Sequence, residues 1–169
     1  MNDGIIESMK VKDLSPNIQA QIVELETQNI LPILASVGLN LTEENMRDQL
    51  KFFRESEVVL SLNAGAVDGF AIYDIKETTV MIVTFNLRKF NSGRILRELL
   101  GQISQNLENS QIQLINSQAN HTNSKSINFH RRMGFIEVGV TEHHIEYQIH
   151  KNDLMQVMQR RGLKPNADS

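Results

Sequence analysis

Hydrophobic and polar residues follow two periods along this chain, one typical of strands and one typical of helices. The clearest change between them lies in the middle of the sequence. Residues 79–85 are mostly β-branched and apolar, which predicts a buried strand. Residues 86–92 are mostly polar, and after Gly93 apolar residues recur at helical spacing, which predicts an amphipathic helix over 94–107. The chain therefore runs from a strand through a polar turn into a helix.

The same patterns predict the other elements. Strands are expected over residues 11–14, 58–62, 69–75, 112–115, 135–140 and 145–149. Helices are expected from Pro16 to about Asn29, from Thr42 through Phe53, over 124–133 and over 151–161. Residues 1–9 are expected to form a loose leader, 30–41 and 116–123 to form loops, and 163–169 to be a disordered tail.

The order of these elements predicts an α/β (α+β) fold. Three strands joined by short turns form an antiparallel meander, and a right-handed crossover through helix 94–107 places strand 112–115 parallel to strand 79–85. We therefore expect a mixed antiparallel and parallel sheet of about six to seven strands, flanked by helices and followed by a C-terminal helix. One domain over residues 1–169 is expected, with its core at about 10–150.

Composition narrows the function. With 169 residues, of which 40% are hydrophobic, the chain can bury the core of one domain. A net charge of −3 argues against nucleic acid as a partner. The absence of cysteine excludes disulfides, thiolate metal sites and a cysteine nucleophile. No apolar run approaches the roughly 18 residues of a membrane span. A soluble, cytoplasmic protein without a membrane partner is the expectation.

The polar turn before helix 94–107 is a candidate anion site. Backbone N–H groups at a helix start have no intrahelical partner, and Arg88 and Lys89 add positive charge beside them. Gly93 would let a ligand approach the backbone closely. A phosphate-bearing ligand is one reading, and an ordinary strand–helix connection with two solvated basic residues is the other. The known glycine-rich nucleotide signatures do not occur in the sequence.

Two segments together resemble motifs of the GNAT superfamily of acyl-CoA-dependent N-acetyltransferases. In the first, a strand valine is followed five residues later by R/Q-x-x-G-x-G/A, and here Val83 precedes residues 88–93 (RKFNSG). The second motif has Asn, then a small residue three positions later, an aromatic proton donor seven positions later, and Gly-Phe eleven and twelve positions later. Here these positions hold Asn123, Ser126, His130, Gly134 and Phe135. The chain departs from the pattern at Asn91, where glycine is usual, and at His130, where tyrosine is usual.

The resemblance implies acetyl-CoA, or another acyl-CoA, as co-substrate. The pantetheine arm would pair with backbone around Ile82 and Val83, and the pyrophosphate would lie on the N–H groups of residues 89–94, with Arg88 as a charged donor. The cofactor-binding residues implied in this way are Ile82, Val83, Arg88, Lys89, Phe90, Asn91, Ser92, Gly93, Arg94 and Asn123.

The resemblance also places His130 where the family tyrosine supplies a proton to the departing thiolate. An imidazole can do this if it is partly protonated, but packing or hydrogen bonding is the alternative role. The strand end where many family members carry a glutamate has Asn116, Gln118 and Asn120 instead, so no general base is identified. The polar residues His121, Glu142, His143 and His144 are alternatives by proximity alone. No metal site is expected at His143, His144 and His150.

The acceptor implied is an amine on a small molecule or peptide, bound between residues 30–44 and the hairpin at 140–146. Four glutamates in these segments would suit a cationic amine, while charges at a helix start and solvation of the hairpin are the alternative reading: Glu43, Glu44, Glu142 and Glu146. A GNAT-fold module that binds acyl-CoA without catalysis, or that serves in regulation, is the rival hypothesis. The C-terminal helix could cover the sheet, close over the site or pair two subunits in a homodimer.

Overall fold

The computed structural model describes residues 4–89 and 93–160. The elements, in chain order, are β1 (Ile5–Lys10), the 3₁₀ turn η1 (Val11–Asp13), α1 (Pro16–Asn29), α2 (Leu31–Ser36), α3 (Glu43–Phe52), β2 (Glu57–Asn63), β3 (Ala66–Lys76), β4 (Thr79–Leu87), α4 (Gly93–Leu107), β5 (Leu114–Asn120), α5 (Ser124–Arg132), β6 (Ile136–Val140), β7 (His144–His150) and α6 (Lys151–Arg160). The polar turn residues 90–92 and the expected tail lie outside the described residues.

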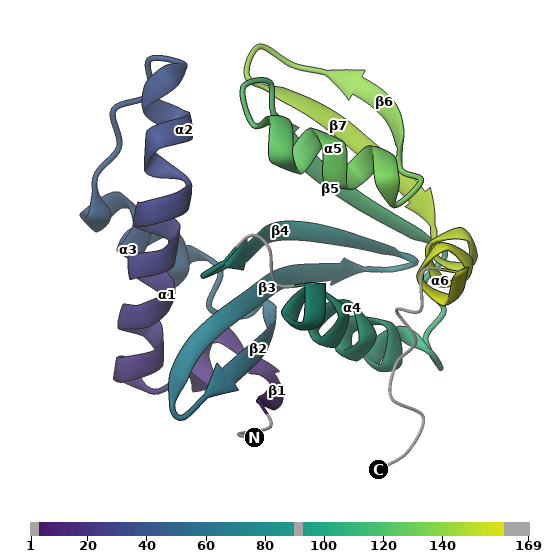
Figure 1. Cartoon of the computed structure of the whole chain (residues 1–169), viewed down its shortest axis with the longest axis horizontal. Helices are drawn as coiled ribbons and strands as arrows, with labels where there is room; N and C mark the ends of the chain where they lie inside the picture. Colours follow the sequence, from purple (N-terminus) through teal and green to yellow (C-terminus); the bar gives the residue numbers. More distant parts are fainter. Residues whose placement is uncertain (1–3, 90–92, 161–169) are drawn as a thin grey trace.

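The seven strands form one sheet in the order β1-β2-β3-β4-β5-β7-β6 (Figure 1). Every neighbouring pair is antiparallel except β4 and β5, which run parallel. The expected meander, the crossover through α4 and the mixed sheet are therefore confirmed.

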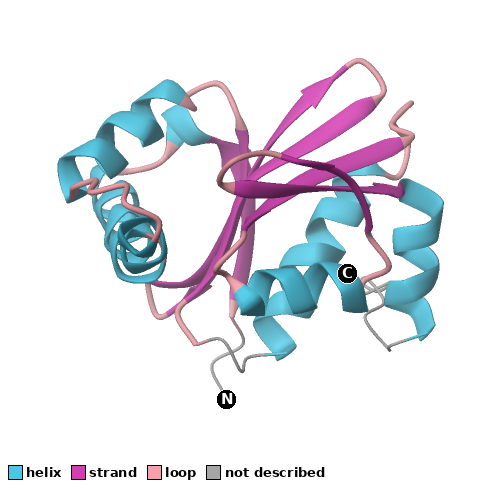
Figure 2. Ribbon diagram, turned by 90° about the horizontal axis from the view of Figure 1, so that it is seen from above, coloured by secondary structure: helices cyan, strands magenta, loops and turns pink. Residues whose placement is uncertain are grey.

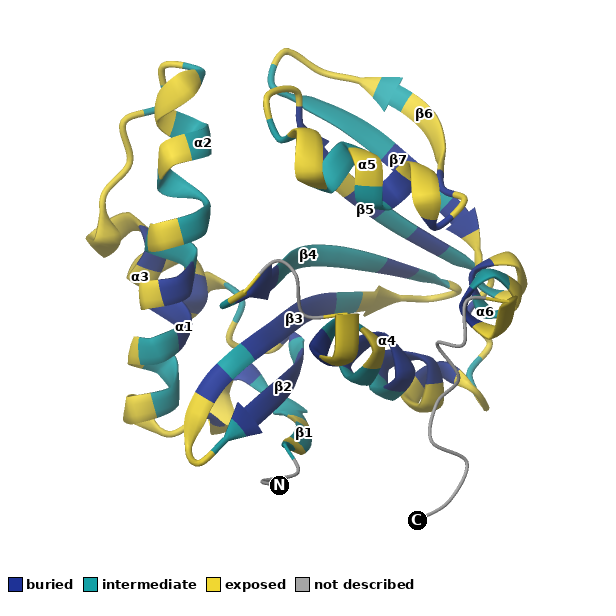
Figure 3. Cartoon of the chain, in the orientation of Figure 1, coloured by how far each residue is buried: buried dark blue, intermediate teal, exposed yellow. Residues whose placement is uncertain are grey.

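Helices lie on both faces of the sheet (Figure 2). On one face, α1 and α3 pack over β2 and β3 in what we call the α1-side core, which includes Ile22, Met46, Val58 and Phe70. On the other face, α4 and α6 pack over the sheet in the α4-side core, which is built around Leu99. Alternate strand residues enter opposite cores, as a pleated strand requires. Figure 3 shows the buried stripe of α4 against the sheet.

The N-terminal residues differ from the expectation. Residues 5–10 are not a leader but the edge strand β1, whose residues pair with β2 from Ile5 opposite Leu62 to Lys10 opposite Glu57. The expected first strand at 11–14 is instead the turn η1, where the backbone N–H of Val11 donates to the carbonyl of Ser56. An edge strand has one partner and tolerates polar residues, so its sequence pattern is weak.

Two predicted loops also contain regular structure. Within residues 30–41, α2 forms with Pro32 in its first turn, where the missing N–H of proline costs no hydrogen bond. Strand β5 continues through polar residues to Asn120, because β7 pairs with it along its whole length, from Leu114 opposite His150 to Asn120 opposite His144. The polar residues of β5 therefore belong to the sheet and not to a loop.

Helix α6 covers the sheet end next to α4. Leu154 and Met158 are buried in the α4-side core, the Ser104 hydroxyl donates to the Met158 sulfur at 3.5 Å, and Lys151 Nζ donates to the Leu107 carbonyl at 3.1 Å. Of the three roles open to this helix, the contacts support covering the sheet. Within the described residues, each helix is too short or too polar to cross a membrane.

Candidate functional site

Strands β4 and β5 separate soon after they begin to pair. Thr79, Val80 and Met81 pair with Leu114–Asn116, and no later residue of β4 has a β5 partner within the part of the chain that the structure describes. Figure 1 shows the two strands diverging toward α2. Beyond Met81, the β4 edge facing β5 therefore presents backbone N–H and C=O groups that a bound molecule could pair with.

A bulge in β4 marks the point of divergence. Ile72 of β3 lies opposite Thr84, whereas Tyr73 lies opposite Ile82, so Val83 is the extra residue. A bulge bends its strand and increases the local twist, which turns β4 away from β5. Ile82 packs against the α4-side core and Val83 against the α1-side core.

Helix α4 begins at Gly93, after β4 has ended at Leu87. The backbone N–H groups of Gly93 and Arg94 open the helix, where no carbonyl one turn earlier belongs to the same helix. A Cβ atom placed on Gly93 would meet no described atom within 4 Å, so the surrounding protein does not demand glycine there. The open space beside these donors suits an anionic group. The predicted contacts of Phe90, Asn91 and Ser92 lie outside the described residues.

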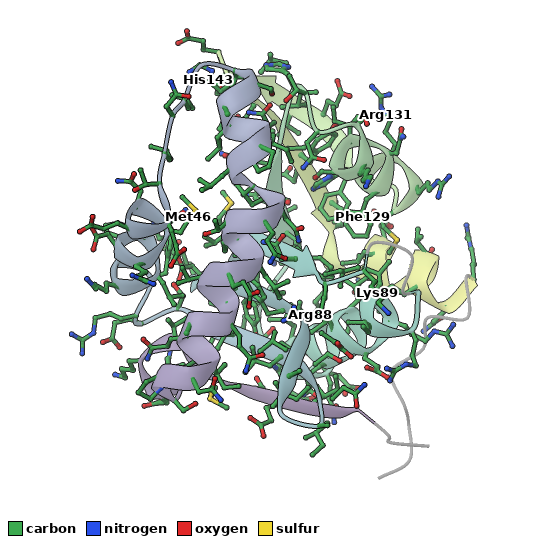
Figure 4. All side chains as sticks on the ribbon, turned by 60° about the vertical axis from the view of Figure 1, so that its left-hand side comes forward. Met46, Arg88, Lys89, Phe129, Arg131 and His143 are labelled. Carbon is green, nitrogen blue, oxygen red and sulfur yellow. The ribbon has the colours of Figure 1, made fainter. Side chains whose placement is uncertain are left out.

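The three predicted basic residues have different surroundings. Arg88 Nε donates to the Val67 carbonyl at 2.9 Å and its backbone N–H donates to the Asp68 carbonyl at 2.8 Å, so Arg88 ties the end of β4 to β3. Arg94 Nη1 pairs with the Glu98 carboxylate, one turn along α4, at 2.7 Å. Lys89 is exposed, and Figure 4 labels it together with Arg88.

Asn123 is the N-cap of α5. Its side-chain oxygen accepts a hydrogen bond from the Ser126 N–H at 3.1 Å. This bond fixes the direction of the helix that carries His130. The predicted cofactor contact of Asn123 stays a prediction.

His130 is only 3% exposed and has partners at both ring nitrogens. Nδ1 donates to the Ser126 carbonyl at 2.7 Å, so the neutral ring accepts at Nε2 from the Ser117 hydroxyl, 2.8 Å away. The ring stacks on Tyr147 with 4.4 Å between centroids. Burial lowers the pKa of His130, an effect partly opposed by the bond to Ser126.

This geometry constrains the predicted proton donor. The neutral ring has one N–H, which is already given to a carbonyl, and burial disfavours the protonated ring that could donate at Nε2. Donation to a thiolate would require release of one of these hydrogen bonds. The catalytic role of His130 stays a prediction, and its observed contacts are those of a packed, hydrogen-bonded residue.

The two faces of β4 carry different chemistry beside the divergence. On the α4 side, Phe85 of β4 stacks with Phe129 of α5 at 5.9 Å between ring centroids. Both rings pack against the α4-side core, and Figure 4 labels Phe129. They form an apolar contact between β4 and α5, the helix that follows β5.

On the α1 side, a polar cluster links α1 to β4. One carboxylate oxygen of Glu26 accepts from the Thr84 hydroxyl at 2.6 Å and from the Asn86 amide at 3.0 Å. Asn29 Nδ2 donates to Asn86 Oδ1 and to the Leu87 carbonyl, each at 3.1 Å. Sequence reasoning missed Glu26. The available signal was its position four residues after the buried Ile22, which places it on the inward face of α1.

One face of β5 carries the three amide residues that stand where many family members have a glutamate. Asn116, Gln118 and Asn120 alternate along the strand and therefore share a face, with Gln148, Glu146 and His144 opposite them on β7. The buried Asn120 amide nitrogen has no hydrogen-bond partner among the described residues, while its oxygen accepts from Thr122. This face offers several amide groups to a polar ligand.

The predicted acceptor segments approach each other near this face. Ser36 at the end of α2 and Thr122 after β5 have their hydroxyls 3.0 Å apart. His121 Nε2 lies 2.9 Å from the Thr141 carbonyl of the closing hairpin. His144 has a pKa lowered first by burial and then by His143 and His121. Among the described histidine and carboxylate side chains, no group of three or more could hold a metal ion.

Comparisons with known proteins agree with this geometry. An acetyltransferase of Thermus thermophilus superposes with a TM-score of 0.68 at 14% identity, covering 89% of this chain and 99% of that one. The PaiA N-acetyltransferase of Thermoplasma acidophilum, solved in complex with coenzyme A, gives 0.66 at 13% identity, with coverages of 86% and 99%. A ribosomal-protein-alanine N-acetyltransferase of Brucella melitensis gives 0.59 at 20% identity, with coverages of 86% and 99%.

These structural likenesses show a shared fold. No sequence among curated proteins matches the chain. The family model described as acetyltransferase (GNAT) domain matches residues 60–156, which is more than half of the chain and includes the diverging strands and the start of α4. The chain therefore belongs to the GNAT family of acetyltransferases.

Proposed function

We propose that this protein transfers an acetyl group from acetyl-CoA to an amine. The observation that carries the proposal is the β4 edge beyond Met81 that β5 leaves unpaired, together with the open space at Gly93, where α4 begins. In a chain of this family, the two features together suit an elongated ligand that pairs through amides and ends in phosphate.

The cofactor assignment follows from what each part of the site offers. Backbone groups of Ile82 and Val83 would pair with the pantetheine amides, because β5 does not occupy that side of the strand. The N–H groups of residues 89–94 would bind the pyrophosphate, and the exposed Lys89 would add positive charge. Arg88 would act mainly by holding the turn through its bond to Val67.

Acyl transfer then needs a neutral amine that attacks the thioester carbonyl, and a proton for the thiolate that leaves. The family resemblance assigns the proton to His130, and we keep this assignment as a separate prediction with its own test. The acceptor would reach the thioester from the side of the polar cluster and the amide-lined face of β5. An amine carried by a small molecule or a peptide is the proposed substrate class.

A screen for thiol release tests the proposal. Purified protein is incubated with acetyl-CoA and a panel of alkyl, aromatic and peptide amines, and free CoA is measured with a thiol reagent. We expect CoA release that depends on both protein and amine. Binding of acetyl-CoA without release in the presence of any amine would favour the rival module without catalysis, and the absence of binding would contradict both.

A further inference from the structure

The polar cluster between α1 and β4 contains a carboxylate that the family resemblance does not account for. Glu26 is held by Thr84 and Asn86, which lie one and three residues after the bulge residue Val83 on the part of β4 that β5 leaves unpaired. Asn86 is only 2% exposed and is itself held by Asn29. The carboxylate is therefore fixed above the strand on which the thioester would lie.

The charge of Glu26 is not neutralised. Both of its donors are neutral, and within residues 4–89 and 93–160 it has no ion-pair partner. Burial raises the pKa of Glu26, and the hydrogen bonds from Thr84 and Asn86 oppose this only in part. A half-buried carboxylate with neutral partners is a site that favours a cation.

The space beside Glu26 fits a small group. A cavity of about 20 Å³ is lined by Glu26, Val83 and Thr84 together with Gln49 and Met46 of α3, and it has room for about one water-sized group. Met46 lies between α3 and α1 (Figure 4). An ammonium group has this size.

We propose that Glu26 is a catalytic residue that binds the acceptor's ammonium group and takes one proton from it; this inference rests on the proposed function. The proton moves from the ammonium nitrogen to the Glu26 carboxylate, which leaves a neutral amine. The amine nitrogen forms a bond to the thioester carbonyl carbon and loses its second proton, and the carbon–sulfur bond breaks. The departing thiolate takes one proton, either the nitrogen's own or one from a donor such as His130 that the nitrogen's proton then replaces. Glu26 then releases its proton to water.

The pH dependence of activity should report the ionisation of Glu26. Glu26 is bonded to Thr84 and Asn86 of β4, and the cavity beside it is lined from α1, α3, β3 and β4 by side chains of which none but Glu26 titrates. In the wild type, kcat/KM for an alkyl amine should rise as Glu26 ionises and fall as the amine in solution loses its proton. A variant without the carboxylate can use only free amine, so its kcat/KM should rise up to the pKa of the amine.

The test compares Glu26→Gln, Glu26→Asp and the control Glu24→Gln, an exposed glutamate on the same helix. The acceptors are n-butylamine and benzylamine, which are protonated at pH 7, and aniline, which is not. At pH 7 we expect Glu26→Gln to lower kcat/KM for the alkyl amines by about 10²-fold or more. The loss should shrink near pH 10, aniline should be little affected, and Glu26→Asp should fall between. Acetyl-CoA affinity and the control variant should match the wild type.

Stability separates this role from a structural one. Because burial raises the pKa of Glu26, its ionisation lowers the free energy of unfolding at pH values above that pKa. Below about pH 4.5 the carboxyl is protonated in both the folded and the unfolded chain, so this cost disappears. Glu26→Gln should therefore be at least as stable as the wild type at pH 8. Wild-type rates with n-butylamine in Glu26→Gln, or equal losses with all amines at every pH, would overturn the inference but not the function. Release of no CoA by the wild type with any amine would overturn both.

Discussion

The two roles considered for His130, proton donor and packed hydrogen-bonded residue, predict different effects of its replacement. Replacing it by Phe removes the partner of the Ser117 hydroxyl and of the Ser126 carbonyl, so we expect a loss of roughly 1–3 kcal/mol in the free energy of unfolding. If His130 also donates the proton, kcat should fall by about 10²–10⁴-fold while acetyl-CoA affinity is kept. Urea unfolding and steady-state rates measure the two effects separately.

The same residue should make stability depend on pH. Its pKa is lowered in the folded protein, so the unfolded chain binds a proton first as the pH falls below about 6.5. The contribution of His130 is therefore fully present above that pH and is lost below it, and His130→Phe should lack this part of the dependence. Wild-type turnover in folded His130→Phe would remove the proton-donor role and leave packing as its function.

Arg88 and Lys89 are neighbours in sequence but should respond differently to replacement. Arg88→Ala breaks the bond to the Val67 carbonyl and should cost about 1 kcal/mol of stability, besides weakening acetyl-CoA binding by about 1–3 kcal/mol. Lys89→Ala should leave stability nearly unchanged and weaken binding less, with a strong dependence on salt because Lys89 is exposed. Unchanged affinity in both variants at low salt would exclude the turn as the phosphate site.

Helix α6 begins inside the family match and ends beyond it, and its last turn adds to the core. Most of it lies within residues 60–156, but Met158 lies beyond them and is 1% exposed. Met158→Ala should lower the free energy of unfolding by about 2–5 kcal/mol, because it leaves a cavity against α4. The exposed Gln156→Ala on the same helix is the control. A change of subunit number on gel filtration without loss of stability would instead assign α6 to pairing two subunits.

The divergence of β4 from β5 is the element-scale feature that makes a site. Loss of ladder hydrogen bonds is costly in a buried sheet unless water or a ligand replaces them. The bulge at Val83 bends β4, and the stacked Phe85 and Phe129 pack β4 against α5, while β5 leaves this edge of β4 unpaired. The polar cluster of Glu26 then lies on the opposite face from the aromatic pair.

At the scale of the whole molecule, the features predicted correctly from the sequence are those that hydrophobic periodicity and motif spacing encode. The strand–turn–helix over 79–107 and the parallel crossover were predicted because both patterns are strong. Strand β1 and the polar half of β5 were missed, since their pairing depends on β2 and β7, which are distant in sequence. The bond of Arg88 to Val67 and the cluster around Glu26 are likewise contacts between distant segments.

Calorimetric titration with acetyl-CoA of the wild type and of Gly93→Glu tests the central claim most directly, namely that the β4 edge and the start of α4 form an acyl-CoA site. We expect the wild type to bind one acetyl-CoA and Gly93→Glu to bind none while unfolding like the wild type, because the open space at Gly93 accepts the side chain but its charge repels the pyrophosphate. Gln105→Glu, with the same charge change later on α4, should bind normally. Absence of binding by the wild type, or undiminished binding by folded Gly93→Glu, would contradict the account.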